Sequence, residues 1–130
     1  MKQKFFDSAV AVALTAPGIG KDSKFRHGAV LVRKNRIQTV GQNSYKTHPY
    51  SARYSEYPFT HAEQHAIYRQ GLDNCQGMDI YVVRVNRKGK VRSSKPCSTC
   101  QQIAKDAGIN KICYSTPEGD YAYLDIEKNN

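Results

Sequence analysis

The sequence has no long hydrophobic run. Among its 130 residues, no stretch approaches the roughly 20 apolar residues needed to cross a bilayer. Residues 1–7 lack the apolar stretch and the cleavage site of a secretory signal. These absences exclude a membrane protein and predict a cytoplasmic location. Because the chain is long enough for one hydrophobic core and too short for two, we expect residues 1–130 to form a single domain.

Cysteine is also scarce. The chain has four cysteines, and two of them, Cys97 and Cys100, form a Cys-x-x-Cys pair with a histidine upstream. Without a secretion signal, this arrangement favours metal binding over disulfide bonds. Cys113 lies in an apolar run and is expected to be a small buried residue. Cys75 lies in a turn flanked by glycine and asparagine and is expected to be a free thiol.

Acidic residues are few and unevenly placed. The 11 acidic residues face 20 lysines and arginines, which gives a net charge of +9. Residues 21–53 contain eight cations and one acid, and residues 84–95 contain six cations and no acid. This asymmetry favours an anionic partner, either a phosphorylated small molecule or a strand of nucleic acid. The alternative is a solvated basic surface that only keeps the protein soluble.

Helical and strand patterns alternate along the chain. Apolar residues recur at helical spacing from about residue 4 to 16, before a Pro-Gly pair. Apolar runs at 28–32 and 37–41 flank the turn Lys34-Asn35 and predict an antiparallel hairpin. Further patterns predict helices over 62–70 and 98–107 and strands over 79–85, 109–114 and 121–126, the last strand antiparallel to the one before it. Residues 42–60 form a long loop that leads into His61.

Two short motifs supply a candidate zinc site. They are His61-Ala62-Glu63 and Pro96-Cys97-Ser98-Thr99-Cys100, and both lie where we expect a helix to begin. The partial positive charge of a helix N-terminus lowers the pKa of a cysteine. One imidazole and two thiolates fill three positions of a tetrahedral Zn²⁺ and leave the fourth for water, as in catalytic zinc sites. We therefore predict one Zn²⁺ per chain, held by His61, Cys97 and Cys100.

Glu63 is the candidate acid/base for this zinc site. Two thiolates neutralise the divalent ion and weaken it as a Lewis acid, so a base is needed to take the proton of the bound water. Glu63 lies two residues after His61, on a different side of the first helical turn. It can therefore approach the water from a direction that the ligand leaves free.

Other metal and redox motifs fit these residues less well. His61 and His65 are four residues apart, as the histidines of zincins are, but that motif needs glutamate directly after the first histidine. A zinc finger of the Cys2His2 type needs its histidines after its cysteines. A thioredoxin-like pair would not explain Glu63. Chance placement is the remaining alternative, and two independent motifs in the right order, each at a helix start, argue against it.

The same motifs resemble those of a known family. His-x-Glu followed by Pro-Cys-x-x-Cys is the signature of zinc-dependent nucleobase deaminases. Together with His-Gly-Ala-Val-Leu-Val at 27–32 and Gly-Gln-Asn at 41–43, it makes the chain similar to the zinc-dependent cytidine/deoxycytidylate deaminase superfamily. Within it, the chain most resembles small phage-type deoxycytidylate deaminase-like proteins. The resemblance implies an α/β fold of three layers, α/β/α, around a central mixed sheet of about five strands.

The resemblance also implies roles for the motif residues. In that family zinc activates the water that attacks C4 of cytosine, and the glutamate carries protons to N3 and then to the departing ammonia. Glu63 is by this resemblance the general acid/base, and His61, Cys97 and Cys100 are the zinc ligands. Ala62 offers its backbone N–H to the base or its leaving group.

Further substrate-binding candidates follow from the resemblance, from charge or from position. Asn43 matches the family asparagine that contacts the nucleoside. Arg26, Lys46 and His48 are candidates for a phosphate, and Tyr114 for the wall of the pocket. Each has a structural alternative: a turn residue for Asn43, a solvated charge for the three basic residues, and core packing for Tyr114.

The substrate class is the open question. The expected return strand over 121–126 resembles free-cytidine deaminases, because tRNA-adenosine and polynucleotide deaminases end in a parallel strand. Histidine as the first zinc ligand argues against a free-cytidine deaminase. We expect a homo-oligomer that hydrolyses a cytosine nucleotide, dCMP to dUMP, with release of ammonia. The alternatives are a deaminase of free cytidine or deoxycytidine, a deaminase of cytosine or adenine in single-stranded DNA or RNA, and a zinc-stabilised nucleic-acid-binding module without catalysis.

Overall fold

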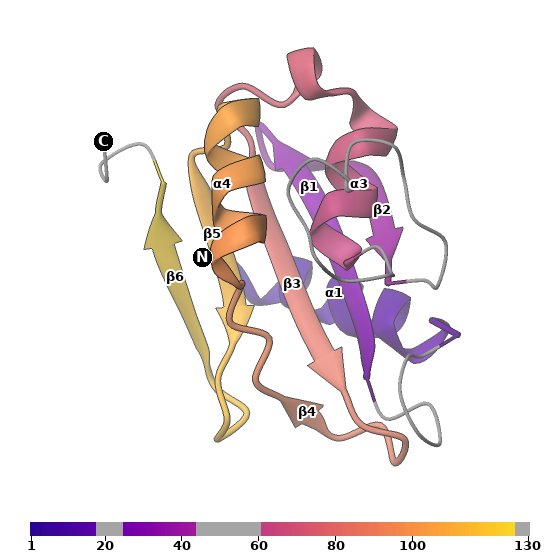
Figure 1. Cartoon of the computed structure of the whole chain (residues 1–130). Helices are drawn as coiled ribbons and strands as arrows, with labels where there is room; N and C mark the ends of the chain where they lie inside the picture. The colour runs from indigo at the N-terminus through magenta and orange to yellow at the C-terminus, as the bar shows by residue number, and fades with distance from the viewer. Residues whose placement is uncertain (18–24, 44–60, 127–130) are drawn as a thin grey trace.

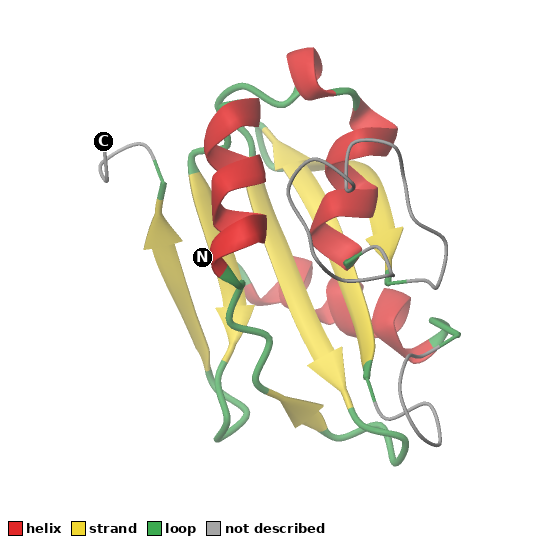
Figure 2. Ribbon diagram, in the orientation of Figure 1, coloured by secondary structure: helices red, strands yellow, loops and turns green. Residues whose placement is uncertain are grey.

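The computed structural model describes residues 1–17, 25–43 and 61–126. A central sheet has α1 against one face and α3 and α4 against the other (Figure 1), and Figure 2 shows the same three layers by secondary structure. No helix within these ranges is long and apolar enough to span a bilayer. In chain order the elements are α1 (Gln3–Leu14), β1 (Arg26–Arg33), β2 (Arg36–Gln42), α3 (Ala62–Gln70), η2 (Leu72–Asn74), β3 (Asp79–Val85), β4 (Val91–Arg92), α4 (Ser98–Ala107), β5 (Lys111–Ser115) and β6 (Tyr121–Asp125).

The sheet is mixed, with its strands in the order β2-β1-β3-β5-β6 and with β4 paired to β3. β3 and β5 run parallel, and the other neighbouring strands run antiparallel. The predicted three-layer α/β fold is therefore confirmed, as is the antiparallel return of the last strand. The sequence patterns do not predict β4 or the 3-10 helix η2, because two or three residues are too few to show a hydrophobic period.

The hairpin of β1 and β2 forms as predicted. Lys34 and Asn35 have φ angles of 49° and 66°, and a two-residue turn of type I′ needs a positive φ at both of its central positions. Asparagine adopts this conformation more readily than most residues. The turn therefore fixes the pairing of β1 with β2.

Alternation along β1 assigns each side chain to one face of the sheet. Ala29 and Leu31 belong to the core cluster beneath α3 and α4, whereas Val30 packs in the cluster with α1. Successive side chains of a strand point to opposite faces. His27 therefore lies on the face of α3 and α4, and Arg26 lies on the face of α1.

Two glycines let helices pack directly against the sheet backbone. A Cβ at Gly28 would overlap the backbone of Ala9 in α1. A Cβ at Gly41 would lie 2.5 Å from the carbonyl oxygen of Ala62 and 2.5 Å from the nitrogen of Ala66, both in α3. Real Cβ atoms do not approach backbone atoms this closely, so glycine is required for α1 and α3 to lie where they do.

We expect Gly41→Ala to destabilise the fold and to displace α3. The new methyl group meets helix backbone rather than a flexible side chain, and overpacking of this kind costs about 1–3 kcal/mol. Urea denaturation followed by circular dichroism measures the free energy of unfolding. The control is Gln38→Ala at an exposed position of the same strand, which should change that free energy by less than about 0.5 kcal/mol. Equal effects of the two substitutions would contradict the packing argument.

Candidate active site

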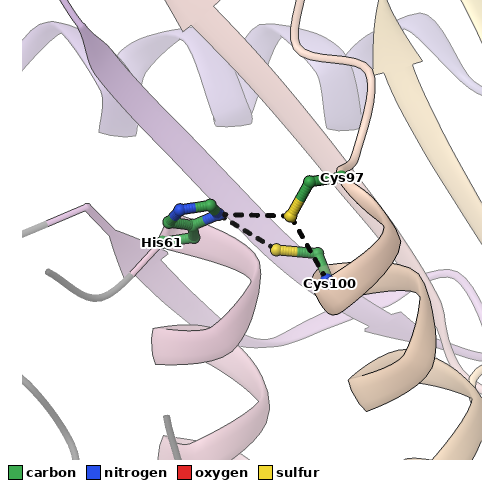
Figure 3. Close-up of side chains that lie close together, drawn as sticks. All are labelled: His61, Cys97 and Cys100. Carbon is green, nitrogen blue, oxygen red and sulfur yellow. Dashed lines mark hydrogen bonds between the residues drawn. The ribbon is translucent and has the colours of Figure 1, made fainter. Parts of the chain in front are cut away.

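The site forms where α3 and α4 begin, on the same face of the sheet (Figure 1). His61 is the N-cap of α3, Cys97 is the N-cap of α4, and Cys100 stands in the first turn of α4. The three side chains point toward one another from the two helix starts (Figure 3). The fold thus joins His61 to a cysteine that is 36 residues away in the sequence.

The three ligand atoms have the spacing that a zinc ion needs. His61 Nδ1 lies 3.1 Å from Cys100 Sγ and 3.8 Å from Cys97 Sγ, and all three atoms fall within 4.8 Å of one another. Around a tetrahedral zinc, bonds of about 2.1 Å to nitrogen and about 2.3 Å to sulfur place such atoms roughly 3.6 Å apart. One imidazole and two thiolates at this spacing fit Zn²⁺ and leave one tetrahedral position for water.

Without metal, the two cysteines share one proton. The hydrogen bond from Cys100 lowers the pKa of Cys97 to about 4 against the effect of burial, and His61 lowers it further. The same hydrogen bond, together with burial, raises the pKa of Cys100 well above its usual value. Burial opposes a charge on His61, but the hydrogen bond to Cys97 and the nearby negative charges raise its pKa. Cys97 is thus already a thiolate at neutral pH, and metal binding has to displace the proton of Cys100.

Glu63 is buried beside these ligands, with an exposed fraction of 5%. Burial raises the pKa of its carboxyl group, although the charge of His61 opposes the shift. A raised pKa brings the carboxyl group closer to neutral pH, where one group can both accept and donate a proton. These properties suit a general acid/base.

Gln64 is a site residue that the sequence analysis missed. Its side chain is fully buried; Oε1 accepts a hydrogen bond from the His61 backbone N–H at 3.1 Å, and Nε2 donates to Cys100 Sγ at 3.8 Å. One amide therefore holds the backbone of one ligand and stabilises negative charge on another. The available signal was a glutamine three residues after the N-cap, the spacing of a capping box.

Three other potential ligands lie away from this cluster. His65, the second histidine of the zincin-like spacing, accepts a hydrogen bond at Nδ1 from the Gln42 N–H at 3.0 Å and so ties α3 to the end of β2. Cys75 and Cys113 are free thiols with exposed fractions of 0% and 1%. Their burial among apolar side chains confirms the expectation for Cys113 and shows that the free thiol of Cys75 is buried as well.

A cavity of about 130 Å³ opens beside the ligands. This is the volume of about four water molecules, so the cavity suits a single heterocyclic ring. Among the described residues, it is lined by Phe25, His27, Asn43, His61, Glu63, Ser94, Lys95 and Cys97.

The sequence patterns do not predict four of these lining residues. Phe25 and His27 flank Arg26 on the opposite side of the backbone, and Ser94 and Lys95 directly precede the Pro-Cys-x-x-Cys motif. Burial lowers the pKa of His27 to about 3, and the positive charges of His61 and Arg84 add to the effect. His27 therefore lines the cavity as a neutral ring.

Asn43 is the substrate-binding candidate that lines the cavity. Its side chain is 3% exposed; Oδ1 accepts from the His27 N–H at 2.9 Å, and Nδ2 donates to the Phe25 carbonyl at 2.6 Å. Asn43 therefore fixes the backbone of Phe25 and His27, two lining residues at the start of β1. Ala62 is fully buried as the first residue of α3, between His61 and Glu63.

The remaining substrate-binding candidates lie elsewhere. Arg26 is on the α1 face, where its guanidinium group donates to two backbone carbonyls at 3.4 and 2.7 Å. This placement gives no support to its assignment to a phosphate. Tyr114 lies on the face of the site but packs against the core cluster and is not among the lining residues. Lys46 and His48 lie outside the described residues.

We expect the purified chain to hold one zinc ion, and Cys97→Ser and Cys100→Ser to lose it. A serine hydroxyl is not deprotonated near neutral pH and is a poor zinc ligand. Inductively coupled plasma mass spectrometry measures the ratio of zinc to protein. The matched control is Cys75→Ser, which removes a buried thiol outside the cluster and should keep the metal. Full zinc content in Cys100→Ser would rule out the assigned ligand set.

In the metal-free protein, we expect iodoacetamide to alkylate Cys97 first. Its pKa of about 4 makes it a thiolate at neutral pH, whereas burial raises the pKa of Cys75 to about 11 and that of Cys113 to about 12. The rate at Cys97 should be constant from about pH 6 to 8, where an ordinary thiol speeds up roughly tenfold per pH unit. Peptide mapping by mass spectrometry gives the rate at each site. Added zinc should protect Cys97, and a rate that climbs with pH would contradict the low pKa.

Solved structures with this fold include two kinds of deaminase. A cytidine deaminase from Burkholderia pseudomallei has a TM-score of 0.68 at 19% identity, covering 98% of this chain and 94% of that chain. A dCMP deaminase from the cyanophage S-TIM5 has a TM-score of 0.63 at 18% identity, covering 89% of this chain and 86% of that chain. The cyanophage enzyme has also been solved in complex with dCMP and dUMP. At these identities the likeness shows the fold alone, and none of the curated proteins matches the chain.

A family model matches most of the chain. It describes the cytidine and deoxycytidylate deaminase zinc-binding region and covers residues 1–116. The matched range includes the three ligands, Glu63 and every described residue that lines the cavity. The chain therefore belongs to the cytidine and deoxycytidylate deaminase family and is a zinc-dependent hydrolytic deaminase.

Proposed function

We propose that this deaminase converts dCMP to dUMP. The observation that carries the proposal is the composition of the cavity wall, which holds Glu63 and two zinc ligands together with Lys95. Lys95 is exposed and makes no ion pair within the described part of the chain. A cytosine ring that fills the cavity leaves its sugar at the mouth, where this ammonium group favours an attached phosphate.

The residues of the cavity supply the proton transfers of the reaction. Bound zinc supplies a Lewis acid that lowers the pKa of a water. Glu63 takes a proton from the attacking water as oxygen bonds to C4 of the base, and it delivers that proton to N3 of the ring. It then moves the proton of the new C4 hydroxyl to the amino group, so that the C4–N bond breaks, the C4 carbonyl forms and ammonia leaves. One water is consumed for each dUMP and ammonia formed.

The Phe25 ring supplies a second element of base recognition. It lines the same cavity as Glu63, and an aromatic face stacks well on a pyrimidine ring. Asn43, which directly follows β2, donates to the Phe25 backbone carbonyl at 2.6 Å. This buried hydrogen bond fixes the backbone from which the ring extends and so lowers the cost of ordering the residue when the base enters.

Two observations favour a small nucleotide over a polynucleotide. β6 returns antiparallel to β5, the arrangement expected of deaminases that act on small substrates rather than on nucleic acid strands. The cyanophage enzyme with this fold has been solved with dCMP and dUMP. Support for single-stranded nucleic acid rests on the basic run over residues 84–95 and on aromatic residues between positions 45 and 59, which lie outside the described residues. A homo-oligomer, a cytoplasmic location and a single domain stay predictions.

We expect the zinc-loaded protein to deaminate dCMP with a higher kcat/KM than deoxycytidine or CMP. Ammonia release, followed by a coupled assay, measures the rate on dCMP, CMP, both nucleosides and a cytosine-containing oligonucleotide. Glu63→Gln keeps the size of the side chain but cannot move the proton, so turnover should fall by about 10²–10⁴-fold with zinc content retained.

The result also separates the alternatives. A preference for deoxycytidine would make the enzyme a nucleoside deaminase, and activity on the oligonucleotide alone would make it a polynucleotide deaminase. Unchanged turnover in Glu63→Gln would remove the acid/base assignment. Loss of zinc from that variant would show instead that Glu63 has a structural role.

A further inference from the structure

Two arginines face each other on neighbouring strands beside the cavity. His27 of β1 pairs with Arg84 of β3, and Arg84 pairs with Arg92 of β4. These residues therefore form one row across three strands. Because His27 lines the cavity and directly paired residues point to the same face, both arginines lie on the face of the sheet that carries the site.

Nothing in the described chain neutralises this pair. Like charges placed directly opposite on antiparallel strands destabilise a sheet, and neither arginine makes an ion pair with a described carboxylate. Burial and the charge of Arg92 lower the pKa of Arg84. The Nε–H of Arg84 is also buried without a hydrogen-bond partner. A buried donor without a partner, next to a second positive charge, is typical of an anion-binding site that holds no anion.

Direct contacts connect the row of His27, Arg84 and Arg92 to the cavity. The guanidinium carbon of Arg84 lies 5.2 Å from the centroid of the Phe25 ring, and Phe25 lines the cavity. Lys95, three residues after Arg92, lines it as well. An anion between Arg84 and Lys95 would therefore lie at the mouth of the cavity, outside the space that a base fills.

The segment that carries Arg92 and Lys95 is held in place by buried serines. Ser94 Oγ donates to the Val82 carbonyl at 2.8 Å and accepts from the Ser115 N–H at 2.8 Å. Ser115 Oγ donates to the Arg92 carbonyl at 2.6 Å. These bonds tie β4 and the following residues to β3 and β5, so the backbone that carries the cations is positioned before any ligand arrives.

Stacking on Phe25 accounts for only part of this arrangement. A cation over an aromatic ring is favourable on its own, and it would explain a single arginine at position 84. It does not explain Arg92, whose charge faces Arg84 from the next strand. The second arginine costs stability unless an anion lies between the two.

We propose that Arg84 and Arg92, with Lys95, bind the 5′-phosphate of the substrate and so make the enzyme select a nucleoside monophosphate over the nucleoside. The inference rests on the proposed function. A terminal phosphate carries close to two negative charges at neutral pH, which matches a compact group of three cations better than a phosphodiester with one charge. Arginine also offers a planar fork of donors to phosphate oxygens.

The test compares kcat and KM for dCMP and deoxycytidine in three variants: Arg84→Gln, Arg92→Gln and Lys95→Gln. Each should raise KM for dCMP by about tenfold or more, as the loss of a charge-assisted hydrogen bond does, and leave kcat/KM for deoxycytidine unchanged. Lys88→Gln is the matched control, because it removes the same charge from the exposed turn of the same basic run and should change neither. Zinc content and circular dichroism confirm that each variant folds.

A binding measurement separates this inference from the proposed function. Inorganic phosphate should bind the wild-type holoenzyme in isothermal titration calorimetry and compete with dCMP, and both effects should weaken in Arg84→Gln and Arg92→Gln. If the wild type deaminates dCMP but the variants keep its preference over deoxycytidine, the inference fails and the proposed function stands. If the wild type deaminates neither compound yet binds phosphate through these arginines, the proposed function fails and the anion site stands. Loss of oligonucleotide deamination without a change on dCMP would overturn the monophosphate assignment.

Discussion

The hydrogen bonds among His61, Cys97 and Cys100 are the interaction on which the site depends. Each residue stands at the start of a helix, and each start is fixed by packing: α3 lies against the bare backbone of Gly41, and α4 crosses between the parallel strands β3 and β5. The partial positive charge of the two helix N-termini then favours a thiolate at Cys97. A shift of either helix would separate atoms that now lie 3.1–3.8 Å apart, so metal binding and helix packing are one constraint.

Most elements of the fold could be predicted from the sequence because their signals are local. Lys34-Asn35 specifies its own turn, Gly108 ends α4 in the left-handed conformation with φ 78°, and strong apolar runs mark β1 and β3. What the sequence could not provide was the contact between elements. The two-residue strand β4 exists only because β3 lies beside it. No pattern within residues 91–92 predicts that pairing.

The residues of the site also divide into those that a local motif predicts and those whose place depends on contacts between elements. His61, Cys97 and Cys100 were predictable because chemistry allows few other readings of that ligand set and spacing. The charge of Arg26 predicts a phosphate ligand, but the pairing of β1 places this residue on the α1 face, where it donates to two backbone carbonyls. His27, one residue later, reaches the cavity instead. Strand alternation anchored on Ala29 and Leu31 makes this distinction, because a charged residue can serve a site only from the face on which the site lies.

The sequence does not predict Gln64 for a different reason. Its role depends on Cys100, which approaches it only in the folded chain.

The same argument distinguishes the basic residues of the proposed phosphate site from those that only set the net charge. Lys88 and Lys90 are exposed on a turn and are free to be solvated. Arg84 is different, since its partner across the strands is another arginine and its Nε–H is buried without an acceptor. A fold retains such an arrangement at a cost in stability, and the cost is recovered when an anion binds.

The stability of this protein should therefore depend on two ligands. The metal removes the proton that two cysteines share, and the phosphate relieves the repulsion of two arginines. Both effects act on the segments that flank Pro96, which buried hydrogen bonds already hold between β3 and α4.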